Sequence, residues 1–373
     1  MKYYIIAGER SGDLHGSNLV KAMLRLSPRA TFRGFGGDEM QKAGVHLVMH
    51  YNQLAFMGFQ AVINFLKIAK YMKDCKADIL ELKPDALILI DYGGFNRQMA
   101  TFGKANGIKV LYYIPPKVWA WRQGRAWQLK KNVDRMFVIL PFEKEFYKKY
   151  DFEVDYVGNP VVDAIKSFVP NLNFLLENNL SKEKRIVAFL PGSRKMELKM
   201  IVPLMAEVAK RNPAYQYVVA AVDNLAEELY APLRGLGNVK FVYNATYDLL
   251  THAEAAIVTS GTATLETALF KVPQVVVYKA GGLEYWIVIA VIKVKFISLV
   301  NLIAGKEVVK EMIQSKANVE SVGGELQALL QDPPYREMML KEYDQLYKTL
   351  DIGSASENTA KLILDFKNKD VGF

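Results

Sequence analysis

The chain has 373 residues, one cysteine and a formal net charge of +9 at pH 7. This length exceeds a single ordinary core, so we expect two domains. A composition of 51% hydrophobic and 23% charged residues excludes a disordered chain, and the lone Cys75 excludes an intramolecular disulfide. The positive charge favours a polyanionic partner, namely nucleic acid, an anionic membrane surface or a phosphorylated substrate.

The first predicted unit is a strand at residues 3–7, a loop with two glycines and three charges, and a helix from His15 to Leu26. A Rossmann-like domain begins in this way, although G-x-G-x-x-G is missing. We expect the loop residues Ser11, Gly12 and Asp13 to face a ligand, and a plain βα turn is the alternative. Residues 1–8 are too short for the apolar region of a signal peptide, which predicts a cytoplasmic protein.

Residues 54–71 are mostly apolar, with lysines along one edge. Both a helix lying in a membrane interface with a basic rim and a helix buried in a core have this composition. The first interpretation makes five large apolar side chains membrane contacts, namely Phe56, Met57, Phe59, Phe65 and Leu66. The longest apolar stretch, 285–303, contains Lys293 and Lys295, so we expect no membrane-spanning helix.

The apolar run 84–91 predicts a buried strand that ends in Asp91. Ligands of open α/β sheets lie at the carboxyl ends of the strands, so Asp91 is well placed for chemistry, with helix capping as the alternative. The next strand, 109–114, leads to a loop that carries Trp119 and Arg122. Aromatic and cationic side chains in one loop suit a phosphosugar or a lipid head group. Single-stranded nucleic acid is the alternative, but no nucleic-acid-binding motif accompanies the loop.

A second α/β set follows a linker expected at 159–179, with strands at 185–190, 217–221, 239–242, 255–258 and 274–278. The first and fourth of these strands are each followed by a small-residue loop that opens a helix, with members Gly192, Ser193, Arg194, Ser260, Gly261 and Thr262. Amides at a helix start and an arginine side chain both bind phosphate, so the two loops could share one diphosphate. Glu266 could receive the hydroxyls of a ribose. Ordinary capped turns are the alternative. Residues 334–369 predict charged helices.

Two Rossmann-like domains with a phosphate site in the second are the plan of the GT-B glycosyltransferases. The chain resembles the lipid-A-disaccharide synthases over nearly its whole length, through the ordered motifs AGERSGDLHG (7–16), VWAWRQGR (118–125), LPGSRKMEL (190–198) and SGTATLE (260–266). The resemblance implies an α/β fold with two Rossmann-like doubly wound domains facing a cleft. We expect an acceptor-side domain at 1–165, a UDP-sugar domain at 166–345, and a helical segment at 346–373 that packs back across the domains.

The reaction that this resemblance implies transfers 2,3-diacylglucosamine from UDP-2,3-diacylglucosamine to 2,3-diacylglucosamine 1-phosphate. Its products are the β-1,6 lipid A disaccharide and UDP. The family inverts the anomeric carbon and uses no metal or other cofactor. Its lipid substrates imply a peripheral protein on the inner face of the inner membrane, and the family allows a homodimer. The alternative is another GT-B-type UDP-sugar transferase or epimerase with a soluble acceptor.

The resemblance also implies residue roles. Asp91 would be the general base, and Arg194 would stabilise the charge on the leaving diphosphate. The UDP-sugar would be held by Gly192, Ser193, Arg194, Ser260, Gly261, Thr262, Ala263, Glu266 and Asn301, while the acceptor side would include Ser11, Gly12, Asp13, Trp119 and Arg122.

The chain departs from the family pattern at three positions. Gly94 stands where a second aspartate is common, Lys117 replaces a serine, and Val300 replaces a proline. Asp91 is retained, so the resemblance still implies activity. Acceptor handling near Gly94 and Lys117 is the property that these departures leave open.

Overall fold

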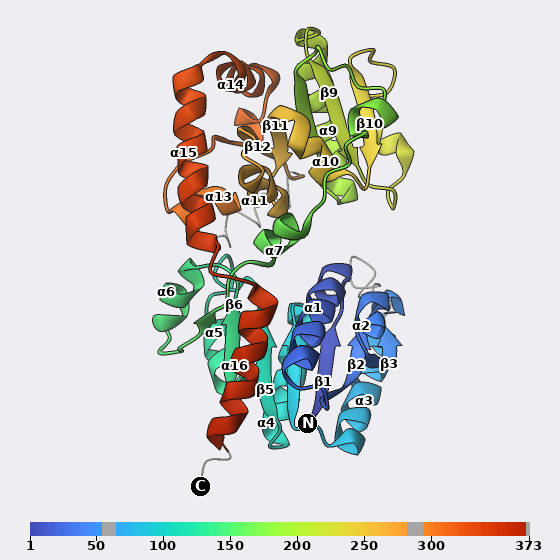
Figure 1. Cartoon of the computed structure of the whole chain (residues 1–373), viewed down its shortest axis with the longest axis vertical. Coiled ribbons are helices and arrows are strands. Elements are labelled where there is room, and N and C mark those ends of the chain that lie inside the picture. The colour runs from blue at the N-terminus through green and yellow to red at the C-terminus, as the bar shows by residue number, and fades with distance from the viewer. Residues whose placement is uncertain (54–64, 282–293, 371–373) are drawn as a thin grey trace. The chain divides into compact units, whose positions relative to one another are not determined.

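The computed structural model describes residues 1–53, 65–281 and 294–370. The chain forms two compact units: unit 1 contains residues 1–160 and 351–373, and unit 2 contains residues 161–350 (Figure 1). These limits differ from the expected boundaries at 165 and 345. The expected C-terminal segment 346–373 divides between the end of α15 (Pro333–Leu350) in unit 2 and α16 (Ala355–Asp370) in unit 1.

Unit 1 is built on a seven-stranded parallel sheet with the order β3-β2-β1-β4-β5-β6-β7. Its strands are β1 (Lys2–Ala7), β2 (Thr31–Gly36), β3 (Val45–His50), β4 (Ala86–Ile90), β5 (Lys109–Tyr113), β6 (Arg135–Val138) and β7 (Asp155–Tyr156). Its helices are α1 (Arg10–Leu26), α2 (Asp38–Lys42), α3 (Phe65–Leu82), α4 (Gly93–Ala105), α5 (Arg125–Asn132) and α6 (Phe142–Lys148), with α7 (Pro160–Ser167) at the junction. All five residues of β4 are buried, because helices cover both faces of a parallel sheet.

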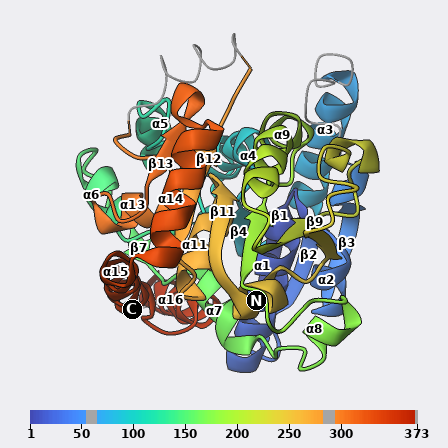
Figure 2. The same ribbon diagram turned by 90° about the horizontal axis from the view of Figure 1, so that it is seen from above.

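Unit 2 repeats this plan in a six-stranded parallel sheet with the order β10-β9-β8-β11-β12-β13. Its strands are β8 (Ile186–Leu190), β9 (Gln216–Ala221), β10 (Val239–Tyr243), β11 (Ala253–Thr259), β12 (Gln274–Tyr278) and β13 (Glu311–Ile313). Its helices are α8 (Phe174–Glu177), α9 (Lys195–Arg211), α10 (Thr246–His252), α11 (Thr262–Leu269), α13 (Leu299–Ala304), α14 (Val319–Gln331) and α15. Helix α14 packs across β11 and β12 (Figure 2). The predicted α/β fold with two doubly wound sheets is confirmed.

Helix α16 belongs to the core of unit 1 although it lies far from that unit in sequence. It packs along α1, and Ala355, Ala360 and Ile363 are fully buried in the cluster that contains β1 and β4. An ion pair of 2.8 Å joins Arg25 of α1 to Glu357 of α16. The last described helix is therefore part of the unit that the first strand begins.

Helix α1 begins at Arg10 and not at His15, so the predicted loop residues Ser11, Gly12 and Asp13 are helical. Gly12 permits this early start, because a Cβ there would lie only 3.3 Å from the Cβ of Ala7.

The proposed membrane segment is largely beyond what the structure describes. Phe56, Met57 and Phe59 lie outside the described residues, and Phe65 and Leu66 begin α3 without described side chains. Among the helices within the described ranges, none combines the length and the apolar character needed to cross a bilayer.

A substitution at Gly34 can test how closely the strands of the unit 1 sheet pack. A Cβ at this position would lie 1.9 Å from the carbonyl oxygen of Ile5 on the paired strand, so Gly34→Ala forces the two strands apart. We expect a loss of about 3 kcal/mol in stability, seen as a lowered thermal midpoint. Gly323→Ala in α14, where a Cβ meets nothing within 4 Å, should instead gain about 0.5–1 kcal/mol. Equal midpoints for the two variants would contradict this account.

Candidate active site

The loops that carry Asp91 in unit 1 and Arg194 and Gly261 in unit 2 lie where the strand order reverses. In unit 1 this point is between β1 and β4, and in unit 2 between β8 and β11. Ile90 pairs with Ala7 in one sheet, and Val258 pairs with Leu190 in the other. The loops that follow each pair of strands therefore start side by side. Ligands of doubly wound folds bind at this reversal, at the carboxyl ends of the strands.

The first loop of unit 2, residues 192–194, is closed by Glu197. One oxygen of this carboxylate accepts hydrogen bonds from the backbone N–H groups of Ser193 (3.1 Å) and Arg194 (3.2 Å), and the other accepts one from the Arg194 guanidinium (2.9 Å). Gly192 has a φ of +100°, and a Cβ there would lie 2.3 Å from Glu197. The chain's own carboxylate thus occupies the start of α9, where the sequence predicted a diphosphate. The Arg194 side chain is 82% exposed and accessible to an anion.

The second loop of unit 2, residues 260–262, is tied down at its first residue. Ser260 donates its hydroxyl to the carbonyl of Ile297 (2.9 Å) and its N–H to the carbonyl of Val277 (3.1 Å). Gly261 and Thr262 are exposed at the start of α11, and Ala263 is half-buried. The first turn of α11 therefore presents its positive end outward, which favours an anion.

Glu266 lies one turn into α11 and is half-buried. Tyr247 donates its hydroxyl to this carboxylate over 2.9 Å. Burial raises the pKa of Glu266 above its ordinary value, and the hydrogen bond from Tyr247 opposes this rise. A carboxylate held in this way retains acceptor capacity for further hydroxyl groups.

Asn301 is fully buried in α13, and its side-chain amide is already engaged. Its nitrogen donates to Val309 (2.8 Å) and to Glu311 (2.9 Å), and its oxygen accepts from the N–H groups of Val308 (2.7 Å) and Val309 (3.0 Å). These four hydrogen bonds give Asn301 a role in holding the loop that contains Val308 and Val309, and its expected contact with the UDP-sugar stays a prediction. Glu311 also accepts hydrogen bonds from the N–H and the hydroxyl of Ser298. Ser298 follows Ile297, whose carbonyl accepts the Ser260 hydroxyl. No local pattern in the sequence pointed to Glu311.

Asp91 of unit 1 stands in a strained turn after β4. Asp91 and Tyr92 both have left-handed backbones, with φ of +47° and +52°, which costs about 1–3 kcal/mol each. The carbonyl of Asp91 accepts hydrogen bonds from Asn96 (2.9 Å) and the Tyr112 hydroxyl (2.8 Å). The Tyr92 ring lies against Gly8, where a Cβ would approach it to 2.3 Å. The turn is thus fixed from several sides.

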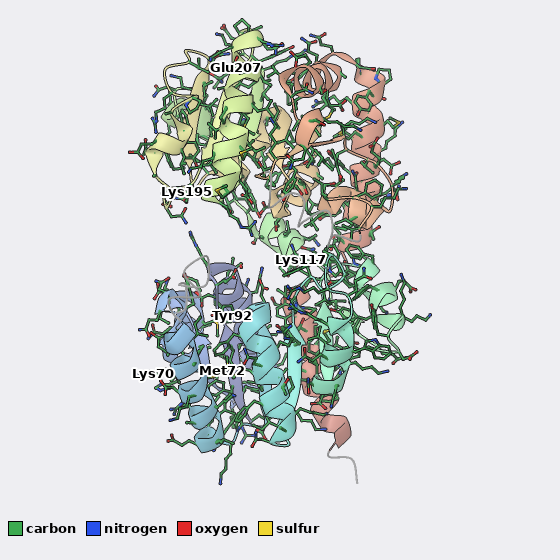
Figure 3. The ribbon with its side chains drawn as sticks, turned by 180° about the vertical axis from the view of Figure 1, so that it is seen from behind. Lys70, Met72, Tyr92, Lys117, Lys195 and Glu207 are labelled. Carbon is green, nitrogen blue, oxygen red and sulfur yellow. The ribbon has the colours of Figure 1, made fainter. Side chains whose placement is uncertain are left out.

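Burial also sets the electrostatics of this turn. It raises the pKa of Asp91, against smaller opposing effects of the Tyr92 N–H and the Lys117 charge. Figure 3 marks Tyr92 and Lys117, which come from the loops after β4 and β5. A raised pKa makes a carboxylate a stronger base, as proton transfer from a hydroxyl requires.

Of the residues expected on the acceptor side, Asp13 and Trp119 have structural partners. Asp13 is 3% exposed and accepts bonds from the N–H groups of Gly37 (2.8 Å), Glu39 (3.1 Å) and Met40 (3.0 Å), so it caps α2. Gly12 is buried too. Asp13 therefore holds the start of α2, and the expected contacts of Gly12 and Asp13 with a ligand stay predictions.

The buried Trp119 donates its indole N–H to Glu143 over 3.1 Å, and burial raises the pKa of Glu143 to about 7. Glu143 was not among the residues predicted from the sequence, because its contact with Trp119 joins positions 24 residues apart. Ser11 and Arg122 are exposed, as an acceptor contact requires.

The role of Asn301 can be tested directly. Asn301→Ala leaves the backbone N–H groups of Val308 and Val309 without their acceptor and removes one of the donors to the half-buried Glu311, so we expect unit 2 to lose about 3 kcal/mol of stability. Thermal unfolding followed by circular dichroism measures this loss. Ser193→Ala, an exposed side chain in the same unit, should leave the midpoint unchanged. An unaltered midpoint for Asn301→Ala would show that these hydrogen bonds do not stabilise unit 2.

The fold of this chain is shared by solved structures of other proteins. Solved structures that share the fold include a Staphylococcus aureus MnaA–UDP co-structure (TM-score 0.70, 14% identity, 98% of this chain and 97% of that chain). A Neisseria meningitidis UDP-GlcNAc 2-epimerase bound to UDP-GlcNAc matches with a TM-score of 0.66, 15% identity and coverage of 99% and 100%. At these identities the likeness shows the fold alone.

Sequence relatives are much more similar. A lipid-A-disaccharide synthase of Geobacter metallireducens is 38% identical over 98% of this chain and 97% of its own length. One from Syntrophus aciditrophicus is 39% identical with the same coverage, and one from Coxiella burnetii is 36% identical over 96% of each chain. The sequence profile described as lipid-A-disaccharide synthetase matches residues 3–363. With a profile match over nearly every residue and relatives of this identity, the chain belongs to the lipid-A-disaccharide synthetase family.

Proposed function

We propose that this chain transfers 2,3-diacylglucosamine from UDP to the 6-hydroxyl of 2,3-diacylglucosamine 1-phosphate, giving the β-1,6 lipid A disaccharide and UDP. The observation that carries the proposal, beside family membership, is the half-buried carboxylate of Asp91 in its strained turn, where burial raises its pKa. In the second unit, an exposed arginine and an outward-facing helix start offer what a UDP-sugar needs. Together these supply a base and an anion site.

In the proposed mechanism the acceptor oxygen attacks the anomeric carbon of the donor from the face opposite UDP. The bond from that carbon to the diphosphate oxygen breaks, and the configuration inverts. Asp91 takes the hydroxyl proton, which increases the electron density on the attacking oxygen. UDP leaves with the bonding electrons, and Arg194 with the first turn of α11 stabilises its growing negative charge. Glu266 receives the ribose hydroxyls.

The loop at the start of α9 contributes to this mechanism while it keeps its hydrogen bonds to Glu197. Glu197 holds the amides of Ser193 and Arg194 and one arm of the Arg194 guanidinium. The exposed remainder of that guanidinium can bind a phosphate oxygen while Glu197 keeps the loop in shape. We therefore assign phosphate binding to the Arg194 side chain, and a supporting role to the loop amides.

The acylated substrates place the enzyme at a membrane surface. We infer peripheral association with the inner face of the inner membrane, through the apolar side chains near the start of α3, including Phe65 and Leu66. The excess positive charge of the chain favours an anionic leaflet. A homodimer is compatible with this arrangement, and size-exclusion chromatography with light scattering would determine the oligomeric state.

The reaction and its base are tested together in detergent micelles that contain both substrates and EDTA. We expect disaccharide and UDP from the wild type. Asp91→Asn should lower kcat by roughly 10²- to 10⁴-fold, because the neutral amide cannot take the proton. Asp74→Asn, an exposed carboxylate of α3, is the matched control and should keep full activity. A fully active Asp91→Asn enzyme would move the base elsewhere. Wild-type enzyme that binds UDP-sugar but makes no disaccharide would favour an enzyme with a soluble acceptor.

Lys117 gives a prediction about pH. If Asp91 is the base, kcat/KM falls as the pH drops through its pKa in the free enzyme. The Lys117 charge lowers this pKa, so Lys117→Gln should raise it and move the acid limb of the profile to higher pH. The Lys117 charge also lowers the pKa of Glu143, so the same comparison is made in a Glu143→Gln background. The shift should persist there if it comes from Asp91. Lys73→Gln, exposed on α3, should leave the profile unchanged. An unmoved limb in Lys117→Gln would show that Asp91 is not the titrating base.

A further inference from the structure

Three arginines gather at the edge of unit 1 that carries Asp91. Arg97 lies near the start of α4, which follows β4, and Arg122 lies in the loop after β5. Arg125 is the first residue of α5. Helices α4 and α5 are in contact, since Asn132 at the end of α5 donates to the Thr101 hydroxyl of α4 over 3.2 Å. The topology therefore brings these side chains to one end of the sheet.

An aromatic side chain holds two of these arginines. The guanidinium carbons of Arg122 and Arg125 lie 5.1 and 5.6 Å from the ring centre of Trp121. The Trp121 side chain is 44% exposed, unlike the buried Trp119 two residues earlier. Arg122 has a left-handed backbone with φ of +54°, and its carbonyl accepts the N–H of Arg125 over 2.9 Å. The strained turn and the stacking keep both guanidinium groups at the surface.

The three arginines have no acidic partner among the residues that the structure describes. The ion pairs of this region use other cations: Lys104 with Asp134, Lys130 with Asp151 and Arg135 with Asp155. Burial and the neighbouring charges of Arg97 and Arg122 lower the pKa of Arg125. Like charges gathered without a counter-ion repel one another, and a bound anion would relieve that repulsion.

We propose that Arg97, Arg122 and Arg125 bind the phosphomonoester of the acceptor sugar, with Trp121 as one wall of the site. This inference rests on the proposed function, in which the acceptor is a sugar 1-phosphate. A phosphomonoester has three terminal oxygens and a charge between about −1.5 and −2 at neutral pH. Planar guanidinium groups bind such oxygens in pairs, which lysines do not. The site therefore selects the phosphorylated end of the acceptor, while Asp91 acts on its hydroxyl.

The test compares two acceptors in neutral detergent micelles: 2,3-diacylglucosamine 1-phosphate and the same sugar without phosphate. For the phosphorylated acceptor, Arg97→Gln, Arg122→Gln and Arg125→Gln should each raise KM by roughly 10- to 100-fold. The KM of the donor should not change. For the acceptor without phosphate the same variants should change KM by less than about threefold, because the interaction is already absent. Arg122→Lys should recover part of the loss.

The controls separate a phosphate contact from a structural role. Arg29→Gln removes an exposed arginine between α1 and β2, at the opposite edge of the sheet, and should change neither KM. Thermal midpoints should be alike for all variants. Variants that impair both acceptors equally, or neither, would overturn the proposal.

The bilayer could supply the same phosphate chemistry through its head groups. In that case the arginine variants would match the wild type in neutral micelles but lose binding to vesicles of anionic phospholipid, an outcome that overturns the acceptor site. If the wild type makes no disaccharide, the proposed function fails separately. Equilibrium binding of 2,3-diacylglucosamine 1-phosphate to the wild type and to the triple arginine variant then decides this site: weaker binding by the variant supports it, and equal binding excludes it.

Discussion

Parallel strand pairing determines where the loops that carry Asp91, Arg194 and Gly261 begin. In each sheet the first and fourth strands of the unit are neighbours, so the loops after them begin side by side at the carboxyl edge. In unit 1 this arrangement brings the Gly8 turn to Tyr92. In unit 2 it brings the Arg194 loop to the Gly261 turn. The chemistry of both units depends on this shared topology, since no regular local element would bring such distant residues together.

Rigid support around reactive groups is the second common feature. Two successive left-handed residues at Asp91 and Tyr92 persist because Asn96 and Tyr112 bond to the backbone there. In the other unit, Asn301 and Glu311 fix the segment that bonds to Ser260. Hydrogen bonds within the protein therefore determine where Asp91 and Ser260 lie. Precise placement of this kind contributes to catalysis, because an ordered site needs little rearrangement during the reaction.

The sequence was sufficient to predict the fold class, the buried strands and the loops at their carboxyl ends. Apolar runs ending in Asp91 or before Gly192 carry that information, because a strand covered on both faces must be apolar along its length. The partners of the polar side chains were not predictable in this way. Asp13 accepts hydrogen bonds from backbone N–H groups that lie 24 to 27 residues further along the chain. Asn301 accepts one from Val308, in a loop whose conformation no local sequence pattern predicts. The arginine cluster likewise needed the contact between α4 and α5.

The place of α16 has a consequence for how the protein is made. Unit 1 begins at the first strand, but its core includes Ala355, Ala360 and Ile363. All of unit 2 is translated between Pro160 and Asp351, which takes about 10 to 40 s at roughly 5–20 residues per second. During that interval the surface of α1 that α16 later covers faces water. The complete sequence of unit 2 is therefore synthesised before that of unit 1. On the ribosome, part of the apolar core of unit 1 stays uncovered until α16 has been synthesised.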